Sequence, residues 1–342
     1  MNIYDLSLLD LKKWLKENDG KSFQAEQIYR WIYKQKVSSW EEMRNINKNL
    51  LQKLSENFSL SSLNLVQQQC SKDEQTSKFL WQLKDGKNIE SVLIESGLRR
   101  TVCVSAQVGC AVGCRFCASG KNGLFRNLTT SEIIEQIVAI DKILESKGEN
   151  VSHVVFMGMG EPLHNYDNVI NAIRILIEEK GLNISQRRIT VSTVGIIDKI
   201  YKLAEENLKV NLVLSLHAAN QKTREKLIPI AHKYPLAELI KAMQNYFNVT
   251  KRDITYEYTM LDGINDSVID ANMLVGIIGS RHCTLNIIPY NEVDSADKFK
   301  KPSHQNIQEF REALDRNNIT NTCRYTKGDD IAAACGQLAN QN

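Results

Sequence analysis

Three cysteines lie close together in the segment GCAVGCRFCASG, at positions Cys110, Cys114 and Cys117. Three closely spaced thiolates can hold three irons of a 4Fe–4S cluster, because such clusters are bound through cysteine sulfur. No further cysteine follows this trio until Cys283. One iron of a cluster held by the trio would therefore stay open to a small ligand.

The amino and carboxylate groups of S-adenosylmethionine can fill such an open position. One electron from the cluster then breaks the sulfonium bond and gives a 5′-deoxyadenosyl radical, so the difficult chemistry belongs to the cofactor. The alternative is a structural zinc site, which usually has four ligands in two pairs. Because the sequence has no second Cys-x2-Cys or Cys/His pair at a usual spacing, the pattern favours one 4Fe–4S cluster per chain.

The pattern of apolar residues changes twice along the chain. In residues 1–58 they recur every three or four positions, which predicts a helical N-terminal accessory domain. Residues 59–98 alternate and contain the turn signal Asp85-Gly86, which predicts a short β-rich linker. Residues 99–342 alternate short apolar runs with amphipathic helices, and this part would form the catalytic barrel and end in a cysteine-bearing loop.

Repeated strand–helix units predict an α/β fold with a parallel sheet and helices outside it. About six or seven units favour a curved, partial (βα)6-type barrel, in which chemistry gathers at the C-terminal ends of the strands. The expected N-terminal helices are 6–15, 23–35 and 40–54, and the expected barrel strands are 102–106, 153–158, 188–194, 211–218, 254–261, 284–290 and 320–325.

Polar residues follow several of these expected strands. Gly160 lets backbone approach a ligand, and the carboxylate of Glu161 can accept a hydrogen bond from the ammonium of a bound amino acid. Such side chains suit contacts to the ribose, carboxylate or adenine of S-adenosylmethionine. Taken singly, each is equally typical of a turn or a cap. The other strand-end candidates are Ser192, Ser215, His217 and Asn291.

Composition and charge place the chain among ordinary soluble globular proteins, with 42% hydrophobic and 24% charged residues. No apolar run reaches the ~18 residues of a membrane span, and the N-terminus lacks the apolar core of a signal peptide. We therefore expect a cytoplasmic protein without a membrane partner. The net charge of +3 implies no polyanionic partner by itself. The stretch 96–131, however, has no acid and is either a solvated basic face or an RNA-binding one.

Several strings resemble the RlmN/Cfr family of radical S-adenosylmethionine RNA methyltransferases over essentially the whole chain. They occur in the family's order and include VCVSAQVGCAVGCRFCASGKNGLFRNLT, MGMGEPLHN, RRITVSTVGI, LSLHA and YTKGDDIAAACGQL. The resemblance implies methylation of carbon 2 of an adenosine in 23S rRNA near the peptidyl-transferase centre, and of an adenosine in the tRNA anticodon loop. It also implies two S-adenosylmethionine molecules per turnover. Glu161-Pro162 favours RlmN over Cfr, which methylates carbon 8.

The same resemblance assigns roles to residues that spacing alone does not identify. It implies that Cys335 is methylated and carries the methyl group to the adenine. Cys103 would then attack the Cys335 sulfur and release the product, leaving a transient Cys103–Cys335 disulfide. Glu90 aligns with the family's proposed proton acceptor. By the same matching, the residues that contact S-adenosylmethionine are Gly160, Glu161, Ser192, Ser215, Leu216, His217 and Asn291.

Two other function classes stay open at this point. One is a radical enzyme of the same cofactor class without an RNA substrate, and the other is a non-enzymatic iron–sulfur or zinc RNA-binding module. Taken alone, Cys103 and Cys335 are more typical of small buried side chains than of catalytic thiols. We expect a monomer that receives electrons from a donor such as flavodoxin or ferredoxin.

Overall fold

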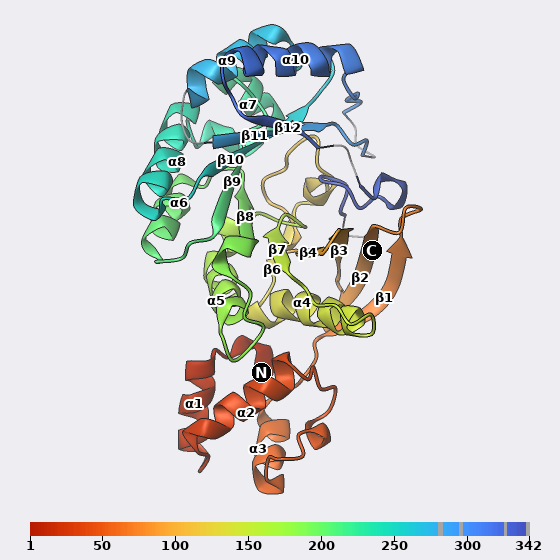
Figure 1. The fold of residues 1–342 in the computed structure, drawn as a ribbon, viewed down its shortest axis with the longest axis vertical. Helices are drawn as coiled ribbons and strands as arrows, with labels where there is room; N and C mark the ends of the chain where they lie inside the picture. Colours follow the sequence, from red (N-terminus) through yellow and green to blue (C-terminus); the bar gives the residue numbers. More distant parts are fainter. Residues whose placement is uncertain (280–282, 294–296, 325–326, 340–342) are drawn as a thin grey trace.

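The chain folds around one ten-stranded sheet with the strand order β1-β2-β3-β4-β7-β8-β9-β10-β11-β12. Figure 1 shows a computed structural model that describes residues 1–279, 283–293, 297–324 and 327–339. From β4 to β12 every neighbouring pair is parallel, whereas β1 to β4 pair antiparallel. The strands are β1 (Leu63–Cys70), β2 (Thr76–Leu83), β3 (Asn88–Ser96), β4 (Arg99–Cys103), β7 (His153–Phe156), β8 (Ile189–Thr193), β9 (Asn211–Ser215), β10 (Ile254–Met260), β11 (Cys283–Pro289) and β12 (Asn321–Cys323).

Helices connect the parallel strands and cover the outer side of the sheet (Figure 1). Within the described residues β1 and β12 are the two ends of the sheet, so the barrel is partial and open. The predicted α/β fold with alternating strands and helices is confirmed; the last expected strand also covers Tyr325, which lies outside the described residues. The helices are α4 (Thr130–Glu145), α5 (Tyr166–Ile177), α6 (Ile197–Glu205), α7 (Gln221–Leu227), α8 (Leu236–Thr250), α9 (Val268–Ile278) and α10 (His304–Arg316).

Three helices precede the sheet: α1 (Leu8–Glu17), α2 (Ser22–Tyr33) and α3 (Lys48–Asn57). The predicted helix 40–54 is wrong in its first half, where the chain forms only a 3-10 turn at Trp40–Glu42. The side chain of Asn47 accepts a hydrogen bond from the Leu50 N–H and caps α3. Asparagine is favoured at this cap, so the helix begins after it rather than before.

The N-terminal helical segment is attached to α4 through buried polar contacts. Glu135 on α4 accepts hydrogen bonds from the backbone N–H of Ser62 at 2.6 Å and of Leu63 at 3.1 Å, and from the amide of Asn2. Lys36 forms a buried ion pair with Asp141, also on α4, at 3.1 Å. None of the helices in the described ranges has both the length and the hydropathy that crossing a bilayer requires.

We predict that Glu135→Ala lowers the free energy of unfolding by about 2–4 kcal/mol, because several buried donors lose their acceptor together. Chemical denaturation would measure the loss. The control is Glu145→Ala on the same helix. Its side chain is 52% exposed, and Lys36, which it meets at 3.4 Å, keeps its buried pair with Asp141, so the loss should stay below about 1 kcal/mol. Equal losses in the two variants would contradict this account of the attachment.

Candidate active site

The cysteine trio lies in the loop of a small hairpin made by β5 (Gln107–Gly109) and β6 (Leu124–Asn127). These two short strands are not predicted from the sequence. Gly109 has φ +77°, and a Cβ at this position would lie 2.1 Å from the carbonyl oxygen of Gly123. The backbone N–H of Cys110 donates to the same carbonyl at 2.9 Å. Glycine is therefore required where the loop closes.

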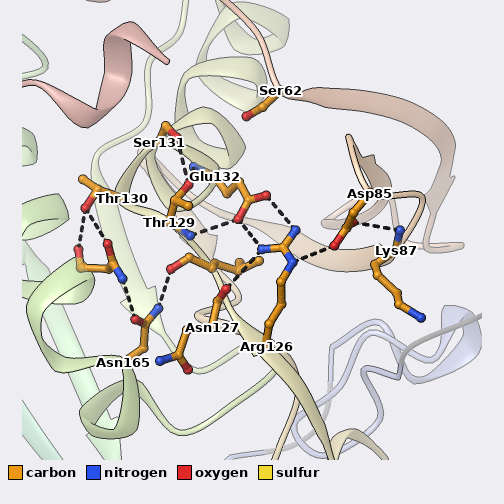
Figure 2. Close-up of polar contacts among 12 residues, drawn as sticks. Ser62, Asp85, Lys87, Arg126, Asn127, Thr129, Thr130, Ser131, Glu132 and Asn165 are labelled. Atoms are coloured by element: carbon orange, nitrogen blue, oxygen red, sulfur yellow. Dashed lines mark hydrogen bonds and ion pairs between the residues drawn. The ribbon is translucent and has the colours of Figure 1, made fainter. Parts of the chain in front are cut away.

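Arg126 on β6 ties this hairpin to two neighbouring elements, as Figure 2 shows. Its guanidinium pairs with Asp85 in the β2–β3 turn at 2.7 Å and with Glu132 in the first turn of α4 at 2.8 Å. Arg100 likewise pairs with Glu149, and Arg115 with Asp297. Acids from other parts of the chain thus neutralise the charge of three arginines in the acid-free stretch 96–131. These three arginines therefore do not form the basic face that the stretch suggested.

The three thiols of the trio face one cavity at the C-terminal ends of the parallel strands, which we call the strand-end cavity. The structure brings most of the predicted site residues to this cavity. Besides Cys110, Cys114 and Cys117, its lining includes Gly160, Glu161, Ser192, Ser215, His217, Asn291 and Cys335.

The residues around the trio fit an iron–sulfur cluster. Among the described residues, no three His, Cys, Asp or Glu side chains converge as the ligands of a single metal ion would. The trio instead surrounds a shared space, which suits three separate irons. Burial raises the pKa of Cys110 to about 12 and that of Cys114 well above its usual value. Cluster binding must therefore displace protons from these thiols.

Glu161 follows β7 and is held by backbone donors. One carboxylate oxygen accepts from the Leu163 N–H at 2.9 Å and the other from the Val194 N–H at 2.8 Å. Burial nevertheless raises its pKa to about 7. Gly160, with φ +100°, lies so close to the side chain of Gln107 that a Cβ would approach within 2.5 Å. Backbone can therefore border the cavity here without a side chain in the way.

Strands β8 and β9 and the segment directly after β9 present four more of the predicted residues. The hydroxyls of Ser192 on β8 and Ser215 on β9 lie 3.2 Å apart. His217 has its Nδ1 accepting from the Thr259 N–H at 2.9 Å, and burial lowers its pKa to about 3, so the ring is neutral. Leu216 differs from the others because its side chain is fully buried in the hydrophobic core. Only its backbone could meet a ligand.

Cys335 is fixed directly against the loop between β5 and β6 that carries the cysteine trio, which we call the cluster loop. The N–H of Ala118 donates to the carbonyl of Gly336 at 2.7 Å, and the hydroxyl of Ser119 donates to the carbonyl of Leu338 at 2.6 Å. The amide of Asn291 donates to the carbonyl of Cys335 at 3.2 Å. Cys335 keeps accessible surface because it faces a cavity, yet surrounding protein raises the pKa of its thiol to about 12, through burial first and the charge of Glu257 second.

Cys103, at the end of β4, lies on the other side of Cys335. Both cysteines line a second cavity inside the sheet, the inner cavity, which also meets Arg99, Arg324 and Lys327. Burial raises the pKa of Cys103, and the Cys335 thiol adds to the rise. The two thiols are free in this structure. The structure therefore brings together the two cysteines that lie far apart in sequence.

Glu90 is placed differently from the other predicted residues. It is 1% exposed, its Oε1 pairs with Lys78 at 3.1 Å, and its Oε2 accepts from the Ala339 N–H at 2.9 Å. It is absent from the residues that border the strand-end and inner cavities. In this conformation Glu90 holds the C-terminal segment, and its role as a proton acceptor stays a prediction.

Two charged residues at the site escaped the sequence reasoning. Glu257 on β10 lines the strand-end cavity, is 5% exposed, and its Oε1 has no hydrogen-bond partner among the described residues. Arg224 on α7 is fully buried beside Cys114. A signal existed for Glu257, because Thr255, Glu257 and Thr259 alternate as polar residues on one face of a strand.

Comparisons with known proteins agree with this geometry. The sequence models of the Ribosomal RNA large subunit methyltransferase N-terminal domain and the Radical SAM superfamily match residues 1–60 and 104–273. The chain is 54% identical, over 100% of its length and 95% of the relative's, to the "Probable dual-specificity RNA methyltransferase RlmN 2" of Protochlamydia amoebophila. The chain belongs to the RlmN family. An RlmN of Lysinibacillus sphaericus is 47% identical, over 99% of this chain and 89% of the relative.

A solved structure extends the agreement to three dimensions. A radical SAM methyltransferase from Sphaerobacter thermophilus matches with a TM-score of 0.95 and 42% identity, over 99% of each chain. The chain is thus a radical SAM methyltransferase of the RlmN family, a class that uses a 4Fe–4S cluster and S-adenosylmethionine. The alternatives of a zinc module and of a non-enzymatic binding protein are set aside.

We predict that Glu257→Gln lowers the pKa of the Cys335 thiol, because it removes a buried negative charge that opposes ionisation. Above neutral pH, alkylation of Cys335 in cluster-free protein should become about tenfold faster, the effect of about one pKa unit. Peptide mass spectrometry would follow the reaction. Glu292→Gln, at an exposed position in the loop after β11, is the control and should leave the rate unchanged. No acceleration in Glu257→Gln would show that the two groups do not interact.

Proposed function

We propose that this RlmN-family enzyme methylates carbon 2 of an adenosine in 23S rRNA near the peptidyl-transferase centre, and an adenosine in the tRNA anticodon loop. The relatives named dual-specificity RNA methyltransferases support both substrates. The observation that carries the proposal is the position of Cys335, which faces the cysteine trio across one cavity and Cys103 across another.

In this proposal Cys110, Cys114 and Cys117 hold one 4Fe–4S cluster. S-adenosylmethionine, used twice per turnover, would lie in the strand-end cavity against Gly160, Glu161, Ser192, Ser215, Leu216, His217 and Asn291. When bound, the pair supplies one-electron cleavage of the sulfonium and hence a carbon radical. Neutral His217, with Nδ1 occupied by the Thr259 N–H, can offer only its Nε2–H to a ligand. Ser192 and Ser215 present adjacent hydroxyls.

Cys335 would accept a methyl group and carry it to the adenine, because a thiolate is a competent nucleophile toward a sulfonium. Carbon 2 of adenine is electron-poor, which makes a radical route necessary. In this proposal the methyl carbon on Cys335 becomes bonded to carbon 2 of the adenine, which links enzyme and RNA covalently. Cys103 would then attack the Cys335 sulfur. The sulfur–carbon bond breaks, the carbon takes the electron pair and a proton to become the methyl group of the product, and a Cys103–Cys335 disulfide remains. Their common border on the inner cavity supports this pairing.

Glu90 is our proposed proton acceptor on family grounds, with one structural condition. Both of its oxygens are engaged, one by Lys78 and one by the Ala339 N–H. Proton transfer would require the C-terminal segment to release Oε2. The alternative of carbon 8 methylation is less well supported, since Pro162 after Glu161 is the RlmN pattern.

The RNA would be held by more than one part of the chain. We propose that residues 1–58 form an accessory RNA-binding domain, joined by residues 59–98 to a catalytic part in residues 99–342. Arg99, Arg324 and Lys327 border the inner cavity and would contact phosphates, which makes binding salt-dependent. The target base must leave any stack to reach Cys335. We further propose a cytoplasmic monomer that takes electrons from a flavodoxin or ferredoxin.

We predict that wild-type enzyme with reductant and S-adenosylmethionine converts unmodified 23S rRNA to a product containing 2-methyladenosine, measured by nucleoside mass spectrometry. Cys335→Ala should form none, since the methyl carrier is lost, while cleavage of S-adenosylmethionine continues. Cys70→Ala, an exposed thiol on β1, is the control and should match wild type. Formation of 8-methyladenosine, or product from Cys335→Ala, would contradict the proposal.

We also predict that Cys103→Ala accumulates a covalent protein–RNA complex, because the thiol that resolves it is missing. Denaturing gel electrophoresis with labelled RNA would detect the slowly migrating species. The double variant Cys103→Ala/Cys335→Ala should give no such species. Release of free methylated RNA by Cys103→Ala at the wild-type rate would remove Cys103 from the mechanism.

A further inference from the structure

Arg224 is the largest fully buried side chain in the described part of the chain. Its Nη2 donates to the carbonyl of Val194 at 2.5 Å and lies 3.5 Å from that of Ser215. Its Nε and Nη1 have no hydrogen-bond partner among the described residues. A guanidinium offers five N–H donors, so most of its capacity is unused.

The charge of Arg224 is also uncompensated. Within the described residues, no carboxylate lies within ion-pair distance of it, whereas the buried cations Lys36 and Lys78 pair with Asp141 and Glu90. Burial lowers the pKa of Arg224 to about 10, so the group stays charged at neutral pH. A buried charge without a partner is costly, which means that the site is incomplete as the polypeptide alone.

The negative charge that would pair with Arg224 is expected on the side of α7 that packs against the cluster loop. The guanidinium of Arg224 donates to the carbonyl of Val194 and lies 3.5 Å from that of Ser215, and both residues line the strand-end cavity. The backbone N–H of Arg115 donates to the carbonyl of Leu227 at 3.0 Å, which fixes the end of α7 against the cluster loop. Apolar side chains, Leu227 and Ile228 with Val112 and Phe116, fill the space between these elements. In such surroundings charges interact strongly, because water does not screen them.

We propose that Arg224 is the internal counter-charge of the 4Fe–4S cluster and raises its reduction potential. Three thiolates outweigh the charge of the oxidised cluster core, and reduction adds one more negative charge. A fixed cation nearby favours the more negative, reduced state. His217 cannot substitute, since its Nδ1 accepts a hydrogen bond and the ring is neutral. The inference rests on the proposed cluster site but requires nothing of the RNA reaction.

The test is an anaerobic redox titration of reconstituted protein, followed by electron paramagnetic resonance. At a fixed solution potential, Arg224→Met should contain at least tenfold less reduced relative to oxidised cluster, a shift of about 59 mV for one electron. Arg224→Lys keeps a positive charge and should lie between this variant and wild type. Lys222→Met, at an exposed position on the same helix α7, is the control; its potential should equal that of wild type.

Thermal unfolding separates a charge role from a packing role. Without iron, Arg224→Met should be at least as stable as wild type, because an unpaired buried charge is removed. Binding of the cluster should then raise the unfolding temperature of Arg224→Met by less than it raises that of wild type. A wild-type potential in Arg224→Met, or in the equally neutral Arg224→Gln if the former does not fold, would overturn the inference. Failure of wild type to bind iron and sulfide would instead refute the proposed cluster site.

Discussion

A backbone hydrogen bond of 2.7 Å, from Ala118 to the carbonyl of Gly336, joins the two halves of the active site. The sheet is open, so no strand pairing fixes the segment that carries Cys335. Its position depends on single contacts from distant elements: Ser119 of the cluster loop, Glu90 of β3, and Asn291 after β11. In Figure 1 this segment, in blue, lies beside β2 and β3. Because each anchor comes from a different part of the fold, Cys335 is correctly placed only when the whole sheet and the cluster loop are formed.

The charges of the interior show the same dependence on parts that come from far apart. Buried pairs such as Lys78–Glu90 are complete in the polypeptide, and they tie strands and segments together. Arg224 and Glu257 are the exceptions that border the site: one has two nitrogens, the other one oxygen, without a partner among the described residues. A buried polar group without a partner costs free energy, so such groups are rare unless a ligand or a reaction uses them. Their position around the strand-end cavity therefore indicates that the protein folds around groups that it does not itself supply.

The sequence was sufficient to predict the alternation of strands and helices and to single out the cysteine trio, because both patterns depend on local spacing. It did not reveal β5 and β6, which are too short to show an alternating pattern. The pairing of the basic residues could not be predicted from the sequence either. The stretch 96–131 contains no acid, yet Asp85, Glu132 and Asp297 reach its arginines from other elements. The burial of Arg224 could not be predicted for a similar reason. The helix sequence QKTREKL is polar except for its last residue and resembles an exposed helix. Its burial comes from packing against the cluster loop, which lies far away in sequence.

Burial of the thiols has a chemical consequence that unites the cysteines. Burial is the largest cause of the raised pKa at Cys110, Cys103 and Cys335, so the site disfavours free thiolate. The forms that the proposed cycle requires avoid that cost. A methyl thioether and a disulfide carry no charge, and an apolar environment accepts them more readily than a thiolate. The three cysteines that we propose as cluster ligands would avoid the same cost by sharing their charge with iron, and there Arg224 would offer a positive charge in low-dielectric surroundings. One apolar site can thus host both functions, because each replaces an expensive isolated thiolate by a neutral or compensated state.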